Sequence, residues 1–308
     1  MGKNYAEVIR RCGLVPVIAL DDPDGAVPLA RALLAGGITV AEITFRTAAA
    51  QEAIRRMREV PGITVGAGTV LTHEQADRAI EAGAEFLVTP GFNPDMVRYA
   101  QERGIFIVPG TSVPGEMEQA LALGLETVKF FPAEQSGGAA KLKAVAAVYP
   151  RLRFMPTGGI TAENMSTYLK LPNVIACGGS WMVKGDLLRA GDFEAVTRLS
   201  RQAVRRMLDW RVASVCLPAG SGEALDRGAA LLEAVGLERM PGDSEPRFEQ
   251  GLWLAQGGAG CLRLETAFLE RAEDFLLRRG VAFDPGPEPG EITLREPLLG
   301  FTVRVAQA

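Results

Sequence analysis

The sequence has few cysteines and almost no histidine. Its cysteines form no C-x-x-C pair, so neither a zinc site nor a disulfide framework is predicted, and a reduced cytoplasmic protein is the simplest interpretation. His73 is the only histidine. A lone histidine excludes a His-based metal site, and no other Asp, Glu and His cluster is visible, so we expect metal-independent chemistry. The scattered cysteines are Cys12, Cys177, Cys216 and Cys261.

Long hydrophobic runs are also missing. A membrane helix needs about 20 apolar residues in succession, and no stretch approaches that length. The N-terminus shows no small-residue cleavage site after its short apolar run, so no signal peptide is expected. The 308 residues are 47% hydrophobic and 23% charged, with a net charge of −4. This balance is typical of a soluble globular protein and argues against a disordered chain or a general nucleic-acid binder.

The charge is unevenly distributed along the chain. Residues 211–308 contain 10 Arg, no Lys and 15 Asp or Glu, for a net charge of −5, whereas residues 1–210 carry a net charge of +1. This shift predicts a boundary near residue 210, with one domain at 1–210 and a second, smaller α+β domain at 211–308. No Ser/Gly-rich linker separates them, since a basic helix from Phe193 to Trp210 runs directly into the next strand pattern.

Short apolar strands alternate with amphipathic helices over the first 210 residues. Eight βα units in about 200 residues fit a (β/α)8 TIM barrel, an α/β fold, at the short end of its size range. The rival is a doubly wound open sheet, but no G-x-G-x-x-G follows the first strand. Thr72 with Gln75 predicts a capping box, and Asn93 before Pro94 predicts an N-cap. The expected strands are Leu14–Leu20, Thr39–Thr44, Thr64–Ala67, Phe86–Thr89, Phe106–Pro109, Thr127–Phe131, Arg153–Pro156 and Val174–Cys177.

Lys129 is the strongest single candidate for chemistry. In a barrel the active site lies at the C-terminal ends of the strands. Of the six lysines, only Lys129 lies in an apolar strand, TVKFFP. A desolvated interior favours the neutral form of an amine, and a neutral amine can attack a ketone to form a Schiff base. The alternative is a structural lysine that extends to the barrel mouth or pairs with a carboxylate.

Glu42 and Arg46 are the next candidates. On a strand, residues i, i+2 and i+4 share a face, so Glu42, Thr44 and Arg46 are expected to point together into the barrel mouth. A partly buried carboxylate can exchange protons during carbon–carbon cleavage, and an arginine can hold a carboxylate with two hydrogen bonds. The alternative is a Glu42–Arg46 ion pair with no catalytic role.

Glycine pairs follow the seventh and eighth expected strands. These are Gly158-Gly159, after Thr157, and Gly178-Gly179, before Ser180. Barrels often bind phosphate at these two loops through backbone N–H groups, and glycine permits a close approach to an anion. Three further strand-end residues could orient a substrate or cap the following helices, and they are Thr69, Pro90 and Thr157.

Together these segments resemble the 2-dehydro-3-deoxyphosphogluconate aldolase family, which also covers 4-hydroxy-2-oxoglutarate aldolase activity. The resemblance spans residues 5 to about 205. The matching segments are Glu42-Ile43-Thr44-Phe45-Arg46-Thr47, Gly66-Ala67-Gly68-Thr69-Val70, Thr89-Pro90-Gly91-Phe92, Val128-Lys129-Phe130-Phe131-Pro132-Ala133-Glu134, Pro156-Thr157-Gly158-Gly159-Ile160 and Gly178-Gly179-Ser180-Trp181.

The resemblance implies a metal-free and cofactor-free class I aldolase, usually a homotrimer. In it, Lys129 is the Schiff-base lysine and Glu42 the general acid/base. The substrate would be 2-dehydro-3-deoxy-6-phosphogluconate, cleaved to pyruvate and glyceraldehyde 3-phosphate. Arg46 and Thr69 would hold the pyruvate half, with Pro90 lining that pocket. The residues that match phosphate-holding positions are Gly158, Gly159, Gly179 and Ser180.

Two other functions stay open. The same chemistry could act on 2-dehydro-3-deoxy-6-phosphogalactonate or on 4-hydroxy-2-oxoglutarate, although two glycine pairs favour a phosphorylated substrate. A non-catalytic small-molecule sensor would require an inactive lysine site.

Residues 211–308 lie outside this resemblance. Two successive β-α-β-β-β halves would fit their pattern, and the segment from Cys261 to Phe283 loosely resembles a vicinal-oxygen-chelate (glyoxalase-like) module. That family binds metal through His and Glu, and this segment has no histidine, which argues against a metal site. A small regulatory domain and a module for oligomerisation or stability are the alternatives. The expected elements are Val212–Leu217, Gly222–Val235, Gly251–Ala255, Cys261–Glu265, Leu269–Arg279, Glu291–Arg295 and Gly300–Val305.

Overall fold

The structure is a computed structural model, and it describes residues 3–235, 237–240 and 245–308. Contacts between Cα atoms divide the chain into two compact units, Met1–Met207 and Leu208–Ala308. They are called the first and second unit below, and each is described by itself.

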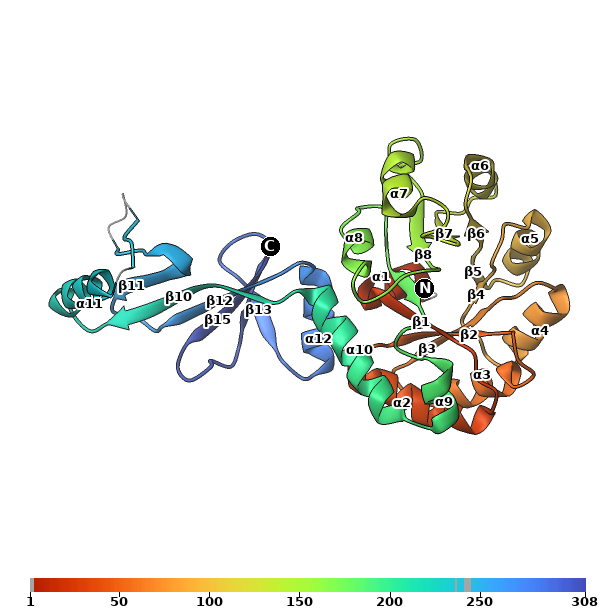
Figure 1. The fold of residues 1–308 in the computed structure, drawn as a ribbon, viewed down its shortest axis with the longest axis horizontal. Helices are drawn as coiled ribbons and strands as arrows, with labels where there is room; N and C mark the ends of the chain where they lie inside the picture. Colours follow the sequence, from red (N-terminus) through yellow and green to blue (C-terminus); the bar gives the residue numbers. More distant parts are fainter. Residues whose placement is uncertain (1–2, 236, 241–244) are drawn as a thin grey trace. The chain divides into compact units, whose positions relative to one another are not determined.

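Parallel strands form the centre of the first unit, and helices surround them (Figure 1). The strands are β1 (Leu14–Ile18), β2 (Val40–Thr44), β3 (Thr64–Gly68), β4 (Phe86–Val88), β5 (Phe106–Val108), β6 (Gly110–Thr111), β7 (Thr127–Phe130), β8 (Arg153–Pro156) and β9 (Cys177–Gly179). Most of their residues are fully buried. Strands that are apolar on both faces are typical of a parallel sheet covered by helices.

The strand pairings run around the whole unit. One sheet has the order β5-β4-β3-β2-β1-β9, and a second has the order β6-β7-β8. Only Pro109 separates β5 from β6, and its carbonyl accepts a hydrogen bond from the backbone N–H of Lys129 on β7, at 2.8 Å. On the other side, Thr157 after β8 forms a parallel bridge with Gly178 on β9. The result is an α/β, TIM-like fold, called the strand ring below.

The helices begin and end as their sequences predict. Asn93 Oδ1 accepts from the N–H of Asp95, with Pro94 at the first position of α5. Thr72 Oγ1 accepts from the N–H of Gln75, and the Gln75 side chain accepts from Leu71 N–H. The Asn93 cap is therefore confirmed, and Thr72 caps α4, but the Gln75 side chain bonds the N–H of Leu71 and not that of Thr72, so the predicted capping box is only half formed. The helices are α1 (Tyr5–Cys12), η1 (Pro23–Gly25), α2 (Ala26–Gly36), α3 (Ala50–Arg58), α4 (His73–Glu81), α5 (Pro94–Glu102), α6 (Pro114–Ala122), α7 (Gly138–Ala146), α8 (Met165–Leu169), α9 (Gly185–Ala190) and α10 (Phe193–Leu208).

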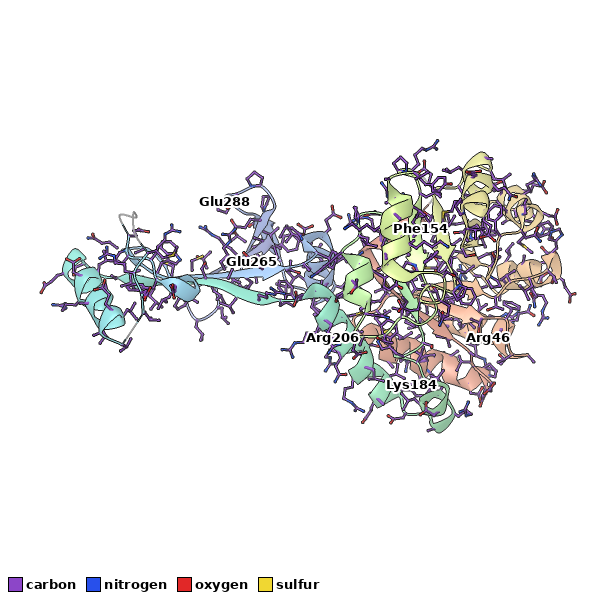
Figure 2. The ribbon with its side chains drawn as sticks, turned by 45° about the horizontal axis from the view of Figure 1, so that its top comes forward. Arg46, Phe154, Lys184, Arg206, Glu265 and Glu288 are labelled. Carbon is purple, nitrogen blue, oxygen red and sulfur yellow. The ribbon has the colours of Figure 1, made fainter. Side chains whose placement is uncertain are left out.

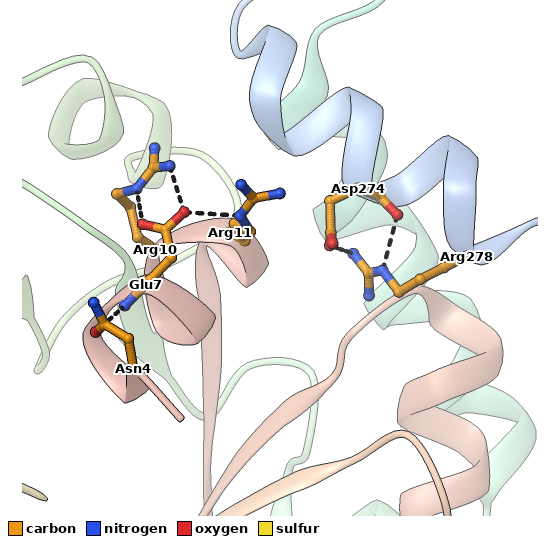
Figure 3. Close-up of polar contacts among 6 residues, drawn as sticks. All are labelled: Asn4, Glu7, Arg10, Arg11, Asp274 and Arg278. Carbon is orange, nitrogen blue, oxygen red and sulfur yellow. Dashed lines mark hydrogen bonds and ion pairs between the residues drawn. The ribbon is translucent and has the colours of Figure 1, made fainter. Parts of the chain in front are cut away.

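The short helix α1 is stabilised by a side-chain cap and by ion pairs. Asn4 Oδ1 accepts from the N–H of Glu7, and the Glu7 carboxylate pairs with Arg10 and Arg11 at 2.7 Å each (Figure 3). These hydrogen bonds, that to Arg10 above all, lower the pKa of Glu7 to about 2. An acidic residue in the first turn and basic residues in the last also suit the helix dipole.

The eighth expected strand was placed too early. The structure starts β9 at Cys177, in register with β1, whereas Val174 forms an isolated bridge with Phe154 on β8. Gly178 and Gly179 therefore belong to a strand, whereas the sequence pattern predicted them in the loop after it. The start of the strand is set by its pairing with β1, and only glycine fits at position 179, because a Cβ there would lie 1.9 Å from the Trp181 ring.

The second unit is built on one mixed sheet with the order β11-β10-β12-β15-β14-β13. The order β12-β15-β14-β13 comes from a β-α-β-β-β run. The first half has β10, α11 and β11. At the positions that match β13 and β14 of the second half, it has two isolated antiparallel bridges, Arg239 with Phe248 and Arg247 with Trp253 of β11. The elements are β10 (Arg211–Ala219), α11 (Gly222–Ala234), η2 (Glu249–Gly251), β11 (Leu252–Gln256), β12 (Cys261–Thr266), α12 (Leu269–Arg278), β13 (Phe283–Pro285), β14 (Glu291–Leu294) and β15 (Thr302–Gln307).

The two faces of this sheet differ in character. Alternate residues on one face pack against the helices in two apolar clusters, one around Leu254 and Ala229 and the other around Val305 and Leu269. The opposite face, called the polar face below, carries Ser214, Arg263 and Arg304, which are register partners on β10, β12 and β15. Helix α12 is also stabilised by an ion pair, Arg278 Nη2 to Asp274 Oδ2 at 2.6 Å (Figure 3). Within the described residues, every helix is too short or too polar to cross a membrane.

Candidate active site

Lys129 and Glu42 meet inside the strand ring. Lys129 lies on β7 and Glu42 on β2, and Lys129 Nζ is 3.3 Å from Glu42 Oε1. The Lys129 side chain is 6% exposed and the Glu42 side chain is fully buried. The neighbours Val128 and Phe130 point to the opposite side, where Phe130 packs edge-to-face on Phe154. The strand alternation thus places one cation and one carboxylate in the interior of the ring.

The position of Glu42 depends on a glycine on the next strand. A Cβ at Gly68 would lie 2.1 Å from Glu42 Oε1 and 2.6 Å from its Cγ, so any side chain there would displace the carboxylate. Glu42 Oε2 is buried and has no hydrogen-bond partner among the described residues. A buried carboxylate oxygen without a donor is unfavourable, so this atom is suited to accept a proton or hydrogen bond from a bound molecule.

Arg46 is not on the strand with Glu42, contrary to the expectation. Strand β2 ends at Thr44, and Arg46 lies exposed in the turn that follows (Figure 2). Its Nε donates to Thr44 Oγ1 at 3.1 Å, and Thr44 donates in turn to the Ile18 carbonyl at 2.7 Å. The described residues contain no Glu42–Arg46 ion pair, because Glu42 pairs with Lys129 instead. Arg46 is therefore tethered beside the mouth of the ring with an exposed guanidinium group.

Thr69 and Pro90 stand just after β3 and β4, and both are half-buried. Thr69 has a φ of 56°, a left-handed conformation that β-branched residues rarely adopt. Such backbone strain is commonly found at functional sites. The Pro90 carbonyl lies so close to Gly110 that a Cβ there would be 2.1 Å away from it. Among the described residues, neither Thr69 nor Pro90 forms a hydrogen bond or ion pair with Lys129 or Glu42, so their link to the pair rests on the shared end of the strand ring.

The two glycine pairs are brought together by a backbone bridge. Thr157 pairs with Gly178, and Thr157 N–H donates to the Phe130 carbonyl, next to Lys129, at 2.9 Å. Thr157 is buried, and its hydroxyl lies near the Met155 carbonyl at 3.4 Å, so it does not cap the next helix. Gly158 and Gly159 both have positive φ. The first pair thus lies just after β8 and the second at the end of the neighbouring β9, with Ser180 exposed directly after it.

A tyrosine–glutamate contact that the sequence did not reveal supports the first glycine pair. Glu134 N–H donates to the Gly158 carbonyl at 3.2 Å, and the buried Tyr168 hydroxyl on α8 donates to the Glu134 carboxylate. Burial, together with that carboxylate, raises the pKa of the Tyr168 hydroxyl. The only signal in the sequence was Glu134 itself, at the end of the segment KFFPAE. Trp181, just after the second glycine pair, also buries an Nε1 that lacks a hydrogen-bond partner among the described residues.

Other features of the first unit lie away from Lys129. A cavity of about 440 Å³ follows β1 and is lined by the loop from Ala19 to Gly25 and by α9. His73 is half-exposed, stacks on Tyr99 at a ring distance of 3.7 Å, and pairs with Asp95 at 2.9 Å. Within the described residues, no three His, Cys, Asp or Glu side chains form a group that could hold a metal ion. None of the four cysteines, all of which the structure describes, is in a disulfide.

A TIM-like fold with a buried lysine beside a buried, partly unpartnered glutamate defines a class of site. The lysine can act as a nucleophile towards a carbonyl, and the glutamate can move protons within the same cavity.

The comparisons with known proteins name the family within this class. The family profile "Aldolase: KDPG and KHG aldolase" matches residues 5–199, and the chain belongs to that family. It is 50% identical over 200 residues to the 2-dehydro-3-deoxy-phosphogluconate aldolase of Treponema pallidum, covering 65% of this chain and 95% of the relative. It is 45% identical over 204 residues to the KHG/KDPG aldolase of Escherichia coli K12, covering 66% of this chain and 96% of the relative.

A solved structure agrees with these matches. The KDPG aldolase of Legionella pneumophila, captured with pyruvate as a covalent carbinolamine intermediate, is 37% identical with a TM-score of 0.63. The match covers 65% of this chain and 98% of that one. These three relatives are therefore matched over nearly their whole length, while about a third of this chain lies outside each match.

Proposed function

We propose that this chain is a class I aldolase that cleaves 2-dehydro-3-deoxy-6-phosphogluconate to pyruvate and glyceraldehyde 3-phosphate. The observation that carries the proposal is the buried Lys129–Glu42 pair at 3.3 Å, with Glu42 Oε2 free to accept. The named relatives support the substrate, and the trapped pyruvate in the Legionella aldolase supports covalent chemistry of this kind.

The reaction begins at Lys129. The ammonium can pass its proton to the adjacent Glu42, and the neutral amine then attacks the C2 ketone of the substrate. Glu42 returns its proton to the carbinolamine hydroxyl, which leaves as water, so that an iminium ion forms and Glu42 is again a carboxylate. A carboxylate at Glu42 next takes the proton of the C4 hydroxyl, the C3–C4 bond breaks, and its electron pair moves into the iminium to form an enamine. Glyceraldehyde 3-phosphate leaves. Protonation of the enamine at C3 and hydrolysis release pyruvate and Lys129.

The remaining site residues would hold the two ends of the substrate. The exposed guanidinium of Arg46, tethered through Thr44, suits the substrate carboxylate, and we assign Thr69 and Pro90 to the same pyruvate pocket. The first glycine pair suits the phosphate, because Gly158 and Gly159 both have positive φ and backbone N–H groups in such a conformation can form an anion-binding concavity. We assign Thr157, Gly158, Gly159, Gly179 and Ser180 to that end.

A second substrate is favoured by one comparison. The Escherichia coli relative carries both activities in its name, KHG and KDPG aldolase. We therefore propose 4-hydroxy-2-oxoglutarate as a poorer substrate, because it has no phosphate for the glycine pairs. The galactonate analogue differs only in stereochemistry, and no described contact favours it.

We also propose a homotrimer and a complete (β/α)8 barrel, as the family resemblance implies. The scattered cysteines favour the cytoplasm, and the charge shift near residue 210 supports a separate α+β domain at residues 211–308. The small-molecule substrate is the partner that the site itself implies. Light scattering of the full chain tests the oligomer, and proteolysis near residue 210 tests the domain boundary.

Borohydride trapping tests the proposed chemistry. The full chain is incubated with pyruvate, reduced with borohydride and mapped by peptide mass spectrometry. We expect a stable adduct on Lys129 that is absent without pyruvate, and cleavage of the phosphogluconate substrate faster than of 4-hydroxy-2-oxoglutarate. A folded protein that forms no adduct would overturn the class I mechanism and favour a sensor.

A further inference from the structure

The second unit has a cavity of about 340 Å³ on the polar face of its sheet. That volume lies within the range of small-molecule sites. Its lining residues come from five strands and from the segment before β11, and they include Arg263, Arg304, Glu288, Glu291, Trp253 and Cys261. This cavity lies entirely in residues 208–308, beyond the family match, so the aldolase proposal does not account for it.

Two arginines lie side by side in this cavity. Arg263 on β12 and Arg304 on β15 are register partners of a parallel pair, so their side chains leave the sheet on the same face from neighbouring strands. Like charges at such positions destabilise a sheet unless they are neutralised. Arg263 has two carboxylates nearby, Glu291 Oε1 at 3.4 Å and Glu288 Oε2 at 3.6 Å (Figure 2 labels Glu288).

Arg304 lacks that compensation. Its Nε is buried without a hydrogen-bond partner, and no residue in the described part of the chain forms an ion pair with it. A buried guanidinium donor cannot be neutralised by losing its proton, because arginine stays charged. An anionic group bound between Arg304 and Arg263 would supply the missing acceptor for both side chains.

Glu291 leaves an acceptor unsatisfied in the same cavity. Its side chain is 3% exposed, and Oε2 is buried with no hydrogen-bond partner among the described residues. Gly286 makes room for it, since a Cβ there would lie 2.8 Å from Glu291 Cγ. The cavity therefore presents an open donor and an open acceptor, both buried, within reach of one small molecule.

We propose that this cavity binds a small hydroxy-carboxylic acid. The carboxylate lies between Arg263 and Arg304, and a hydroxyl group of the same molecule donates to Glu291 Oε2. A hydroxyl suits this position better than an ammonium group, because the Arg263 guanidinium is only 3.4 Å from the Glu291 carboxylate and would repel a second cation. Trp253 also lines the cavity and offers an apolar surface, with Arg247 stacked over its ring at 5.2 Å.

Cys261 provides a local readout of binding. It lines the cavity and is half-exposed, whereas Cys12, Cys177 and Cys216 are buried. Burial also raises the pKa of the Cys216 thiol, which slows its reaction. A thiol reagent applied to the native full chain should therefore modify Cys261 first, and a molecule in the cavity should protect it regardless of events at Lys129.

The experiment measures the Cys261 modification rate by peptide mass spectrometry against rising gluconate or glycerate. We expect saturable protection of about fivefold or more. Acetate, which lacks a hydroxyl group, and glycerol, which lacks a carboxylate, should protect only at much higher concentration. Arg304→Met should raise the half-protecting concentration about tenfold or more, since it removes a charged hydrogen bond, and Arg304→Lys should have an intermediate effect.

Arg295→Met is the matched control. Arg295 lies just after β14, pairs with Asp284 on the exposed surface at 2.7 Å, and does not line the cavity. It should leave the protection unchanged. The proposal is overturned if neither hydroxy acid protects Cys261 in the folded chain, if glycerol protects as well as gluconate, or if Arg304→Met and Arg304→Lys both leave protection intact. Protection by inorganic phosphate alone would overturn the assignment to a carboxylate.

Discussion

The two units each contain a buried glutamate beside a cation on a sheet, and the geometry is closely similar. Glu42 Oε1 lies 3.3 Å from Lys129 Nζ in the first unit, and Glu291 Oε1 lies 3.4 Å from Arg263 Nε in the second. In both, the carboxylate Oε2 is buried and has no hydrogen-bond partner in the described part of the chain. In both, a glycine on a neighbouring segment, Gly68 or Gly286, leaves space for the carboxylate.

The difference lies in the cation. A lysine amine can lose its proton and form a covalent bond, whereas a guanidinium stays protonated and can only bind. Lys129 is also almost fully enclosed at 6% exposure, while Arg263 is 39% exposed. One arrangement of charges therefore supports a reaction in the first unit and, on our proposal, recognition in the second. The identity of a single side chain separates the two functions.

The largest expected effect comes from removing the amine. Lys129→Met keeps the length of the side chain but abolishes the nucleophile, so aldolase activity should fall by more than about 10⁴-fold. Pyruvate trapping should disappear with it. Lys143→Met, at an exposed position on α7, is the control and should keep both. Activity surviving in Lys129→Met would mean that the two buried pairs do not differ in the way described.

Removing the carboxylate should have a smaller effect on activity. Glu42→Gln leaves Lys129 in place but takes away the proton acceptor, so turnover should fall by about 10²–10⁴-fold. The pyruvate adduct should still form on prolonged incubation, which separates the proton-transfer role from the nucleophile. The matched control is Glu296→Gln, an exposed carboxylate in the second unit. Turnover of Glu42→Gln close to that of the control would remove Glu42 from the mechanism.

The glycine loop should respond to its supporting tyrosine. Tyr168→Phe removes the hydrogen bond to Glu134, so the free energy of unfolding should fall by about 1 kcal/mol, and the KM for the phosphorylated substrate should rise more than kcat falls. Tyr149→Phe breaks a similar bond, to Glu118 at 3.1 Å, away from the loop. This control should lose comparable stability with no change in KM. Equal KM effects in both variants would contradict a positioning role.

The smallest effect concerns a surface pair. The pKa of Glu7 is lowered to about 2, so its contribution to stability is present above its unfolded pKa and is lost as the pH falls towards 2. Because Glu7 is 36% exposed, Glu7→Gln should cost at most about 1 kcal/mol at neutral pH and nothing near pH 2. Chemical denaturation across that range checks this. Asp274→Asn on α12 is the equivalent change in the second unit.

Much of the first unit could be predicted from the sequence, because its signals are local. A lysine in an apolar strand and glutamate in another stand out, and parallel strands bring their ends together by rule. The predicted strand boundaries were wrong in two places. The alternating pattern predicted that Arg46 shares a strand face with Glu42, and the last strand was predicted to start at Val174. Both predictions failed because strand ends are set by pairing with neighbouring strands and not by the residues alone.

The second unit was harder to interpret for the same reason. Arg263 and Arg304 each interrupt an alternating apolar strand, which is a visible signal, but their adjacency depends on a parallel pairing between segments some forty residues apart. Glu291 opens a strand and looks like an ordinary surface carboxylate. Only the register of the sheet reveals that these three side chains share one cavity.

Gly68 never touches a substrate in the proposed mechanism, yet its missing side chain defines where Glu42 stands. In a saturation mutagenesis screen for growth on the sugar acid, position 68 should therefore show the same intolerance as Lys129, since even alanine would place its Cβ 2.1 Å from Glu42 Oε1. A map of intolerant positions would rank this glycine among the reacting groups. On this prediction, the space beside Gly68 is as necessary to the reaction as the groups that react.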